Sequence, residues 1–340
     1  MADNITTFQD ISPRGQGIAK GKLLKRYQHL AVTERFGYVD PQPRKMGDQR
    51  VWGRYQDLPR ATAPLAEAVS GPGQKLRRVD YTATLELFGD SVNLTKKVKD
   101  LHEDPVGQEA TDLCGEQARE TIEVIRINVL KAGTNVFYAN GVASRALVNS
   151  PPTRGDFRRI VRAFKRAKAQ KISKIIAATQ NISTQPVEEA YFAMGHTDLD
   201  SDIRGISGFL PVAQYANSGK ALPGEVGSIE ECRIILTPLF EPWEAAGVAG
   251  TAYLSSGAAV SAATACDVYP LIFVAKDAYG IVPLQGKNSI EMGMINPGTP
   301  TKDDQHGLRG FVSWCSWQAC ARLNESWIAR LECAATANPS

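Results

Sequence analysis

The stretch RVDYTATLELFG, residues 78–89, alternates almost without exception between apolar and polar side chains. This period of two is typical of a half-buried β-strand. A second extended run, QRVWGRYQ at residues 49–56, precedes it, and about twenty residues, LPRATAPLAEAVSGPGQKLR, lie between the two runs. The sequence therefore predicts a long β-hairpin with a wide tip. The apolar side chains of its two strands are Val51, Trp52, Tyr55, Val79, Tyr81, Ala83, Leu85 and Leu87.

A two-stranded ribbon of this kind is marginal in water, because its apolar face has nothing to pack against. Strands of about nine residues reach roughly 30 Å. The tip contains Pro59, Pro64 and the triplet Gly71-Pro72-Gly73, and it is too long for a tight turn. We expect the ribbon either to fold back onto its own domain or to lie on a neighbouring molecule.

Residues 105–132 have the pattern of one long helix. Pro105 suits the first turn and Gly133 suits the stop. At 1.5 Å per residue this helix is about 40 Å long, which is typical of a structural spine. Apolar residues recur along it at spacings of three to five, namely Ala110, Leu113, Ala118, Ile122, Ile125 and Val129.

Residues 156–172, DFRRIVRAFKRAKAQKI, predict a second helix with one apolar stripe and a strongly basic remainder. Such a face neutralises the phosphates of a nucleic acid, pairs with an acidic partner subunit or is simply solvated, and the sequence leaves these three interpretations open. The polar face lacks aromatic side chains for base stacking, so a nucleic-acid contact there would be independent of sequence. The basic residues concerned are Arg158, Arg159, Arg162, Lys165 and Arg166.

The rest of the chain indicates an α+β fold. Residues 1–48 are rich in glycine, proline and basic residues, and they predict an extended arm that cannot form a core alone. Short strands follow the second helix and do not alternate with helices as in a doubly wound fold. The candidate strands are KIIAATQ at 174–180, AYFAMG at 190–195, IEECRIILTP at 229–238, DVYPLIFVAKDAYGIVPL at 267–284 and the beginning of FVSWCSWQACARLNESWIARLEC at 311–333.

Composition excludes several classes of protein. With 340 residues, 43% hydrophobic and 22% charged, the chain is able to bury a large core. The net charge of +3 argues against a dedicated polyanion binder, and the six cysteines form no CxxC pair, which argues against a disulfide framework or a zinc ribbon. Residues 1–10 lack the features of a signal peptide, and the uncharged residues 245–266 are too poor in large apolar side chains to span a membrane.

Motifs for catalysis or metal binding are weak. GQGIAKGK at residues 15–22 has the wrong glycine spacing for a phosphate-binding loop, and Leu23 stands where that loop needs a hydroxyl group. DLDSD at residues 198–202 begins like an EF-hand, but Ile203 replaces its glycine and Phe209 replaces its bidentate glutamate. The chain contains neither GxSxG nor HExxH. We therefore expect no catalytic residue, no cofactor and no metal.

The order of arm, long hairpin, spine helix and mixed α/β region resembles the Hong Kong 97-type major capsid protein of tailed bacteriophages. Local sequence is most similar to the capsid-protein family named after gene product 56 of phage N4. The matching segments span about residues 45–332, nearly the whole chain. They are LFGDSVNLTKKVKDL (87–101), GTNVFYANG (133–141), HTDLDSDIRG (196–205), LPGEVGSIEECRIILTP (222–238), DVYPLIFVAKDAYG (267–280) and LRGFVSWCSWQACARLNESWIARLE (308–332).

The resemblance implies a division of the chain into five parts. They are an N-terminal arm at 1–48, an extended loop and its return at 49–104, a peripheral domain with the spine and basic helices at 105–200, a mainly axial domain at 201–290, and a return to the peripheral domain with a C-terminal tail at 291–340. It also implies a tight turn formed by Gly224, Glu225 and Gly227 that leads into a strand from Ile229. The ribbon side chains Val51, Trp52, Tyr55, Val79, Tyr81, Leu85 and Leu87 would contact an adjacent subunit.

The implied function is that of a major capsid protein without catalytic residues. Such a subunit assembles with copies of itself into hexamers and pentamers of an icosahedral head that encloses double-stranded DNA, bound without sequence preference. Scaffolding, portal and decoration proteins would be separate chains, no membrane would be involved, and the protein would be assembled in the host cytoplasm and reside in the virion. The alternative is a nucleic-acid-binding or packaging protein that uses the basic helix at residues 156–174.

Overall fold

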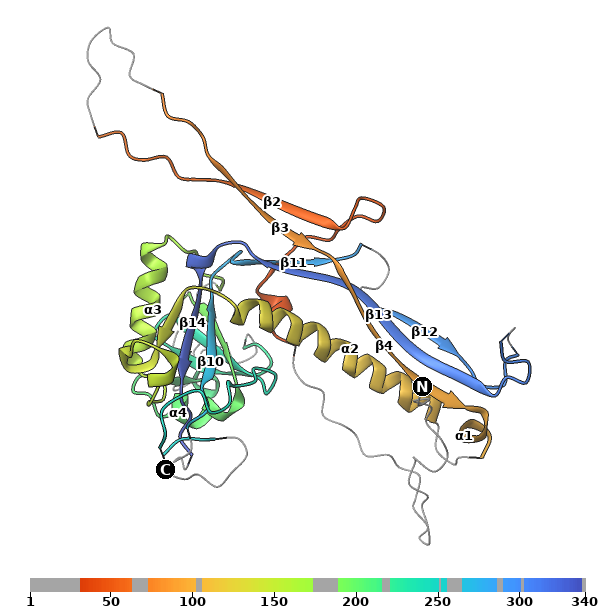
Figure 1. Cartoon of the computed structure of the whole chain (residues 1–340). Helices are drawn as coiled ribbons and strands as arrows, with labels where there is room; N and C mark the ends of the chain where they lie inside the picture. The colour runs from red at the N-terminus through yellow and green to blue at the C-terminus, as the bar shows by residue number, and fades with distance from the viewer. Residues whose placement is uncertain are drawn as a thin grey trace.

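The computed structural model describes residues 31–62, 73–101, 106–173, 189–215, 221–250, 252–255, 265–285, 290–300 and 303–337. The molecule is elongated and has a mixed α+β architecture, with two sheets joined end to end and a ribbon that projects from their junction (Figure 1). The glycine-rich segment at 15–22 and the predicted strand at 174–180 lie outside the described residues.

The larger sheet has seven strands in the order β5-β14-β10-β6-β9-β8-β7. Neighbouring strands are antiparallel except for the β14–β5 and β6–β9 pairs. The strands are β5 (Val136–Tyr138), β6 (Tyr191–Gly195), β7 (Leu210–Pro211), β8 (Glu225–Ile229), β9 (Cys232–Leu236), β10 (Tyr269–Val274) and β14 (Ile328–Cys333).

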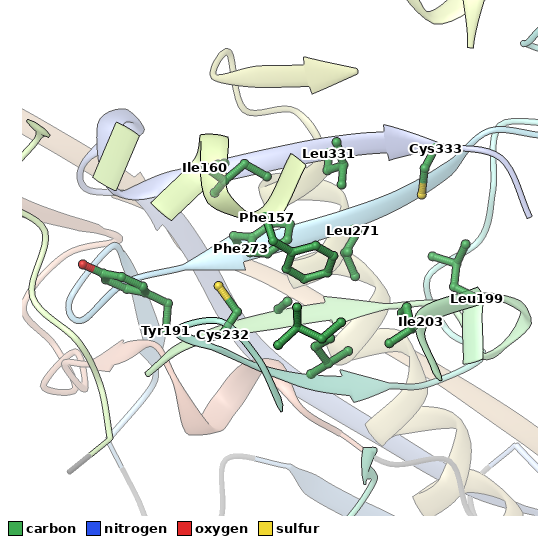
Figure 2. Close-up of a cluster of buried hydrophobic side chains, with 14 of the residues drawn as sticks. Phe157, Ile160, Tyr191, Leu199, Ile203, Cys232, Leu271, Phe273, Leu331 and Cys333 are labelled. Carbon is green, nitrogen blue, oxygen red and sulfur yellow. The ribbon is translucent and has the colours of Figure 1, made fainter. Parts of the chain in front are cut away.

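Both faces of this sheet are covered, so its central strands are apolar throughout rather than alternating. On one face, Phe157, Ile160 and Phe164 of helix α3 (Arg154–Arg166) pack on alternate residues of β10 such as Leu271 and Phe273 (Figure 2). The short helix α4 (Asp200–Arg204) joins this layer through Ile203.

The opposite face of the larger sheet is covered by three separate segments. Ile127 and Leu130 come from the carboxyl-terminal part of helix α2 (Val106–Lys131). Phe36 comes from the described part of the N-terminal arm and stacks on Phe192 of β6 with ring centroids 4.3 Å apart. The third segment is β11, through Tyr279 and Ile281.

The second sheet is built around the 14-residue strand β13. β4 pairs with residues 309–318 of β13, while β12 and β11 pair along the opposite edge. The remaining neighbour is the two-residue strand β1, which runs parallel to β11. The strands are β1 (Tyr38–Val39), β4 (Glu86–Thr95), β11 (Tyr279–Pro283), β12 (Glu291–Ile295) and β13 (Arg309–Arg322), and the short helix α1 (Lys96–Leu101) follows β4.

The two sheets are held together by strands that follow one another in the chain. β10 lies in the larger sheet and β11 in the smaller one, while β13 lies in the smaller sheet and β14 in the larger one. The segment 311–333 is therefore two strands, with a 3-10 turn (Glu325–Trp327) between them. Helix α2 reinforces the junction, since it contacts β4 and β13 at one end and β10 at the other.

Helix α2 confirms the long helix predicted at residues 105–132, but its buried face differs from the predicted stripe. Leu113 is 44% exposed, and the buried positions include Cys114, Ile127 and Leu130 instead. The buried face changes direction along the helix because its two ends pack on two different sheets. A helix with 3.6 residues per turn does not present a single, evenly spaced stripe to both sheets.

The boundary expected between residues 200 and 201 runs through one structural unit. β6 precedes this boundary and β9 follows it, yet the two strands are hydrogen-bonded neighbours in the larger sheet. The basic helix α3, expected with the spine helix, packs on this same sheet. The physical reason is that α3 buries its apolar stripe against strands from both sides of the boundary.

A buried carboxylate fixes the described part of the N-terminal segment to helix α2. Glu123 of α2 is 1% exposed and accepts hydrogen bonds from the Val32 and Thr33 backbone N–H groups, at 2.7 and 2.8 Å, and from the Thr33 hydroxyl, at 2.6 Å. The carboxylate therefore serves as the cap of the 3-10 turn Thr33–Arg35.

We expect Glu123→Ala to lower the free energy of unfolding by about 3 kcal/mol, because it leaves three buried donors without an acceptor. Glu123→Gln keeps one acceptor oxygen and should cost less. Urea unfolding of the two variants, followed by circular dichroism, checks this. An alanine variant as stable as the glutamine variant would contradict the role of the carboxylate.

Candidate intersubunit surfaces

The predicted hairpin is present as a two-stranded ribbon of β2 (Gln49–Tyr55) and β3 (Arg78–Thr84). Directly opposed residues of an antiparallel pair share a face. Trp52 opposes Tyr81 and Arg54 opposes Val79, so these four lie on one face, together with Ala83. We call this the inner face, because its base packs on the smaller sheet.

The base of the ribbon is docked on its own chain. Ala83, and Leu85 just beyond β3, pack against Val282 of β11 and Ala319 of β13, and Trp52 lies beside them. Leu85 is 6% exposed, so it is not available to a neighbouring molecule, and this corrects the expectation that it contacts an adjacent subunit. The docking also explains how a ribbon that is marginal alone keeps its shape.

The outer face of the ribbon has no such cover within the described residues. Val51 is 48% exposed and Tyr55 is 60% exposed, and their opposed residues are Thr82 and Arg78. Leu58 and Leu76, which lie beyond the paired strands, are also exposed. Figure 1 shows the ribbon extending well beyond the body of the molecule.

The alternation that predicts the hairpin continues past Leu85, but the covered face changes. Ala83 and Leu85 pack on Val282 and Ala319, on one side of the smaller sheet. Phe88, Val92 and Leu94 of β4 lie on the other side, beneath α2. Leu87 keeps the side of Leu85, where it is exposed and pairs with the exposed Trp317 of β13.

The basic helix starts at Arg154, two residues before the predicted start, and ends at Arg166, six residues before the predicted end. Thr153 and Asp156 form its cap, with the Thr153 hydroxyl donating to the Asp156 carboxylate at 2.7 Å. Lys168 follows with a φ of 54°, a left-handed conformation that stops the helix.

Much of the basic face is neutralised inside the chain. Arg154 and Arg158 both donate to Glu230, at 2.5 and 2.9 Å, and Lys165 pairs with Glu231. Glu230 and Glu231 form the turn between β8 and β9.

The rest of this basic segment divides between internal pairs and solvent. Arg159 pairs with Asp156 at 3.2 Å and donates to the Tyr138 carbonyl oxygen at 2.6 Å. Arg162 and Arg166 are exposed.

These ion pairs make the attachment of α3 sensitive to pH. The Arg154 guanidinium holds the pKa of Glu230 below its ordinary value of 4.5. Burial raises the pKa of Glu231, but hydrogen bonds from Lys165 and Lys171 outweigh burial and the net shift is downward. A lowered pKa contributes stability above the ordinary value that is lost as the pH falls through the folded value.

We expect the midpoint temperature of thermal unfolding to decrease as the pH is lowered below 4.5. In the Glu230→Gln/Glu231→Gln variant this decrease should be smaller. The difference should be modest, about 1 kcal/mol, since the basic partners are largely exposed and screened by solvent. Differential scanning calorimetry between pH 6.5 and pH 3.5, an interval of about one to two units either side of the carboxyl pKa, measures both curves. Parallel curves would show that these carboxylates do not hold the helix.

The turn implied at residues 222–227 is shifted. Gly224 has a φ of 80° and forms the turn, but Glu225 and Gly227 belong to strand β8, which begins four residues earlier than Ile229. Gly227 is needed for a different reason, since a Cβ there would lie 2.5 Å from the Leu210 carbonyl oxygen on β7. At these two positions the structure thus has a strand, β8, which the edge strand β7 approaches closely.

Glu225 is the centre of a buried polar network that the sequence does not reveal. Its side chain is 0% exposed and pairs with Arg233, 5% exposed, at 2.5 Å. The Tyr215 hydroxyl and the Leu222 N–H donate to the same carboxylate at 2.8 and 2.9 Å. The Arg233 guanidinium also lies over the Phe192 ring, 5.1 Å from its centroid.

The acidic run DLDSD contributes to local structure. It forms the turn into α4 (Asp200–Arg204), where Asp198 accepts a hydrogen bond from Tyr269 at 2.8 Å. Within the described ranges, no group of three or more His, Cys, Asp or Glu side chains has the geometry of a metal site. No helix among the residues that the structure describes combines the length and apolarity needed to cross a membrane.

Comparison with known proteins places this architecture among viral shells. The fold is similar to the capsid of Ralstonia phage GP4, with a TM-score of 0.66, 14% identity, and coverage of 98% of this chain and 100% of that chain. It is similar to the capsid of cyanophage Pam1, with a TM-score of 0.66, 12% identity and coverage of 99% and 100%. The head protein of Helicobacter pylori bacteriophage KHP40 gives a TM-score of 0.59 at 14% identity, covering 98% of both chains.

One curated sequence relative supports the same class. The major capsid protein of Pseudomonas phage KPP21 is 24% identical over 279 residues, which cover 75% of this chain and 68% of the relative. No family model matches the chain. The chain therefore has the fold of tailed-phage capsid proteins, and the mixed helix and strand class expected from the sequence is confirmed.

Proposed function

We propose that this chain is a major capsid protein, a structural subunit that assembles with copies of itself into the shell of a phage head. The observation that carries the proposal is that the whole chain follows the capsid fold, including a ribbon with an exposed apolar outer face. A monomer gains nothing from projecting Val51 and Tyr55 into water, whereas a shell covers them with the next subunit. The function is structural, and we assign no catalytic residue.

We further propose the finer assignment to the Hong Kong 97-type architecture and to the family named after gene product 56 of phage N4. In this assignment β2 and β3 belong to the extended loop and α2 is the spine helix. The larger sheet with α3 and α4 is the axial domain, and the smaller sheet with α2 is the peripheral domain. The support is the order of these elements and their arrangement around the two sheets.

In this proposal hexamers and pentamers close an icosahedral head around double-stranded DNA. The protein is assembled in the host cytoplasm and resides in the virion, and scaffolding, portal and decoration proteins are separate partners. DNA would be contacted without sequence preference. The exposed Arg162 and Arg166 suit such a contact better than Arg158, Arg159 and Lys165, which are engaged in ion pairs within the chain. A dedicated nucleic-acid-binding function for α3 is therefore the weaker candidate.

Negative-stain electron microscopy of the purified full-length protein tests the function. We expect closed shells, or rings and tubes built from the same subunit, at micromolar concentration. A protein that stays strictly monomeric, both alone and with scaffolding protein from its own phage, would contradict the proposal.

A further inference from the structure

Trp243 lies in the segment between β9 and β10, and three cationic side chains approach its indole ring. The Arg145 Cζ atom is 3.7 Å from the ring centroid, the Lys131 Nζ atom 4.8 Å and the Arg330 Cζ atom 5.3 Å. Cation–π attraction extends to about 6 Å, so all three groups interact with the same ring. We call these four residues the Trp243 cluster.

The cluster joins parts of the chain that are far apart in the sequence. Lys131 is the last residue of α2, Arg145 begins a 3-10 turn, and Arg330 lies on β14. The Arg330 Nη1 atom donates to the Lys131 and Gly133 carbonyl oxygens, so this side chain also caps the end of α2. The sequence does not reveal the cluster, because its cations lie neither in the N-terminal arm nor in the basic helix.

One buried carboxylate serves two of these cations. The Glu332 side chain is 0% exposed, and it accepts hydrogen bonds from Arg145 Nε and Nη2, at 2.7 and 2.8 Å, and from Arg330 Nε, at 2.9 Å. Lys131 has a neutral acceptor instead, since its Nζ donates to the Glu241 main-chain carbonyl oxygen at 2.8 Å. The cluster therefore keeps an excess of positive charge even when the exposed Glu241 carboxylate is counted.

Two guanidinium nitrogens of the cluster have no acceptor. Within the part of the chain that the structure describes, no oxygen is bonded to Arg145 Nη1 or Arg330 Nη2. Both nitrogens reach solvent, since neither is a buried atom that lacks a partner, and the Arg145 side chain is 34% exposed. Burial lowers the pKa of Lys131 and that of Arg330, and the nearby Arg145 guanidinium lowers both pKa values further. The positive charge is thus incompletely compensated within the chain.

A phosphate group has the chemistry that these donors require. Its several oxygens accept hydrogen bonds from more than one cation at once, and bonds from guanidinium and ammonium groups to phosphate are charge-assisted. Arginine presents a planar fork that matches phosphate oxygens, while lysine adds a point charge. The indole ring shields one side of the cations from water, which strengthens their attraction for an anion.

We propose that the Trp243 cluster binds a phosphate group. The group is either free inorganic phosphate or a phosphate of a nucleic-acid backbone, since both present the same kind of oxygen. The site goes beyond the proposed capsid function and does not depend on it, because all of its cations belong to one chain and are in place before any assembly.

Isothermal titration calorimetry of the unassembled full-length protein with sodium phosphate tests the site, with sodium chloride holding the ionic strength constant. Lys131→Met keeps the apolar stem and removes the ammonium, and Arg145→Lys keeps the charge and removes the fork. Lys276→Met removes the same charge at an exposed position elsewhere and is the control. Arg330 is left unchanged because it caps α2. Thermal melting followed by circular dichroism checks that each variant is folded.

We expect the wild type to bind phosphate with a Kd of about 1 mM, and Lys131→Met and Arg145→Lys each to raise that Kd about tenfold or more. Lys276→Met should stay within about twofold of the wild type. Phosphate should also change the tryptophan fluorescence, and Trp243→Phe should lose that change. A wild type that binds no phosphate, or a control as impaired as Lys131→Met, would overturn the proposal.

Fluorescence anisotropy with a short labelled DNA duplex distinguishes the two sources of phosphate. If the nucleic-acid backbone is the ligand, Lys131→Met should weaken duplex binding by the same factor as phosphate binding, and inorganic phosphate should compete with the duplex. If free phosphate is the ligand, duplex binding should be unchanged in this variant. Each of these results supports the site. Loss of the site leaves the capsid function standing, and a protein that never assembles leaves the site standing.

Discussion

Replacing residues 56–77 by the dipeptide Asn-Gly should leave a folded monomer that no longer forms shells. Tyr55 and Arg78 are directly opposed at the end of the ribbon, so a two-residue turn joins them with the geometry that favours a hairpin. Within the described part of this segment, the replacement removes the Lys168–Asp57 ion pair and a backbone hydrogen bond from Gln56 to Arg77. An exposed ion pair contributes at most about 1 kcal/mol, so the fold should tolerate the change.

The loss of assembly should be complete, because every intersubunit contact made by the ribbon beyond its paired strands is removed at once. Circular dichroism and thermal melting check the fold, and sedimentation velocity checks assembly. A variant that instead replaces residues 56–77 by a glycine-serine linker of equal length separates reach from side-chain contact, and we expect it to fail as well. Shells formed by the Asn-Gly variant would show that the ribbon tip is dispensable.

Glu225→Ala should be the most destabilising single substitution that we propose. It leaves the Arg233 guanidinium, 5% exposed, without its carboxylate, and it removes the acceptor of the Tyr215 hydroxyl and the Leu222 N–H. Breaking a buried ion pair from one side costs about 3 to 5 kcal/mol. Urea unfolding of the unassembled protein measures the loss.

Paired substitutions separate the charge from the packing at this site. Glu225→Gln keeps two polar atoms in place and should lose less, while Glu225→Leu with Arg233→Met removes both charges and should recover much of the stability. An alanine variant within about 1 kcal/mol of the wild type would mean that water replaces the carboxylate, so that the network is not closed as the structure indicates.

The sequence predicts the ribbon and the long helix α2 well because both depend on local patterns. Alternation over residues 78–85 and helical spacing over residues 105–132 each extend for several periods, so one or two exceptions do not hide them. The change of covered face after Leu85 is different. It depends on β4 leaving the ribbon to pair with β13, more than 200 residues later in the chain, and no local pattern contains that pairing.

The sequence predicts the candidate surfaces only in part, for a similar reason. Val51 and Tyr55 lie on the exposed outer face of the ribbon, but Leu85 is covered by β11 and β13. The apolarity of a strand residue does not say whether its own chain or another will cover it. The basic face of α3 shows the same limit, since Glu230 and Glu231, more than 60 residues away, neutralise part of it.

The glycines that flank Glu225 favour a turn, yet this residue lies in a strand. Its partner Arg233 lies on the neighbouring strand β9, where the register of the β8–β9 pair brings the two side chains together. The signal in the sequence is weak, because an acidic and a basic residue eight positions apart are common in any chain. Burial of both side chains, which distinguishes a structural ion pair from a solvated one, follows only from the packing of β7, Tyr215 and β8.

Electron cryomicroscopy of the assembled particle at side-chain resolution tests whether identical copies cover the ribbon. We expect a closed shell in which the outer face of β2 and β3, marked by Val51 and Tyr55, lies against an adjacent subunit. A particle in which that face remains in solvent in every subunit, or a preparation that contains only monomers, would contradict it.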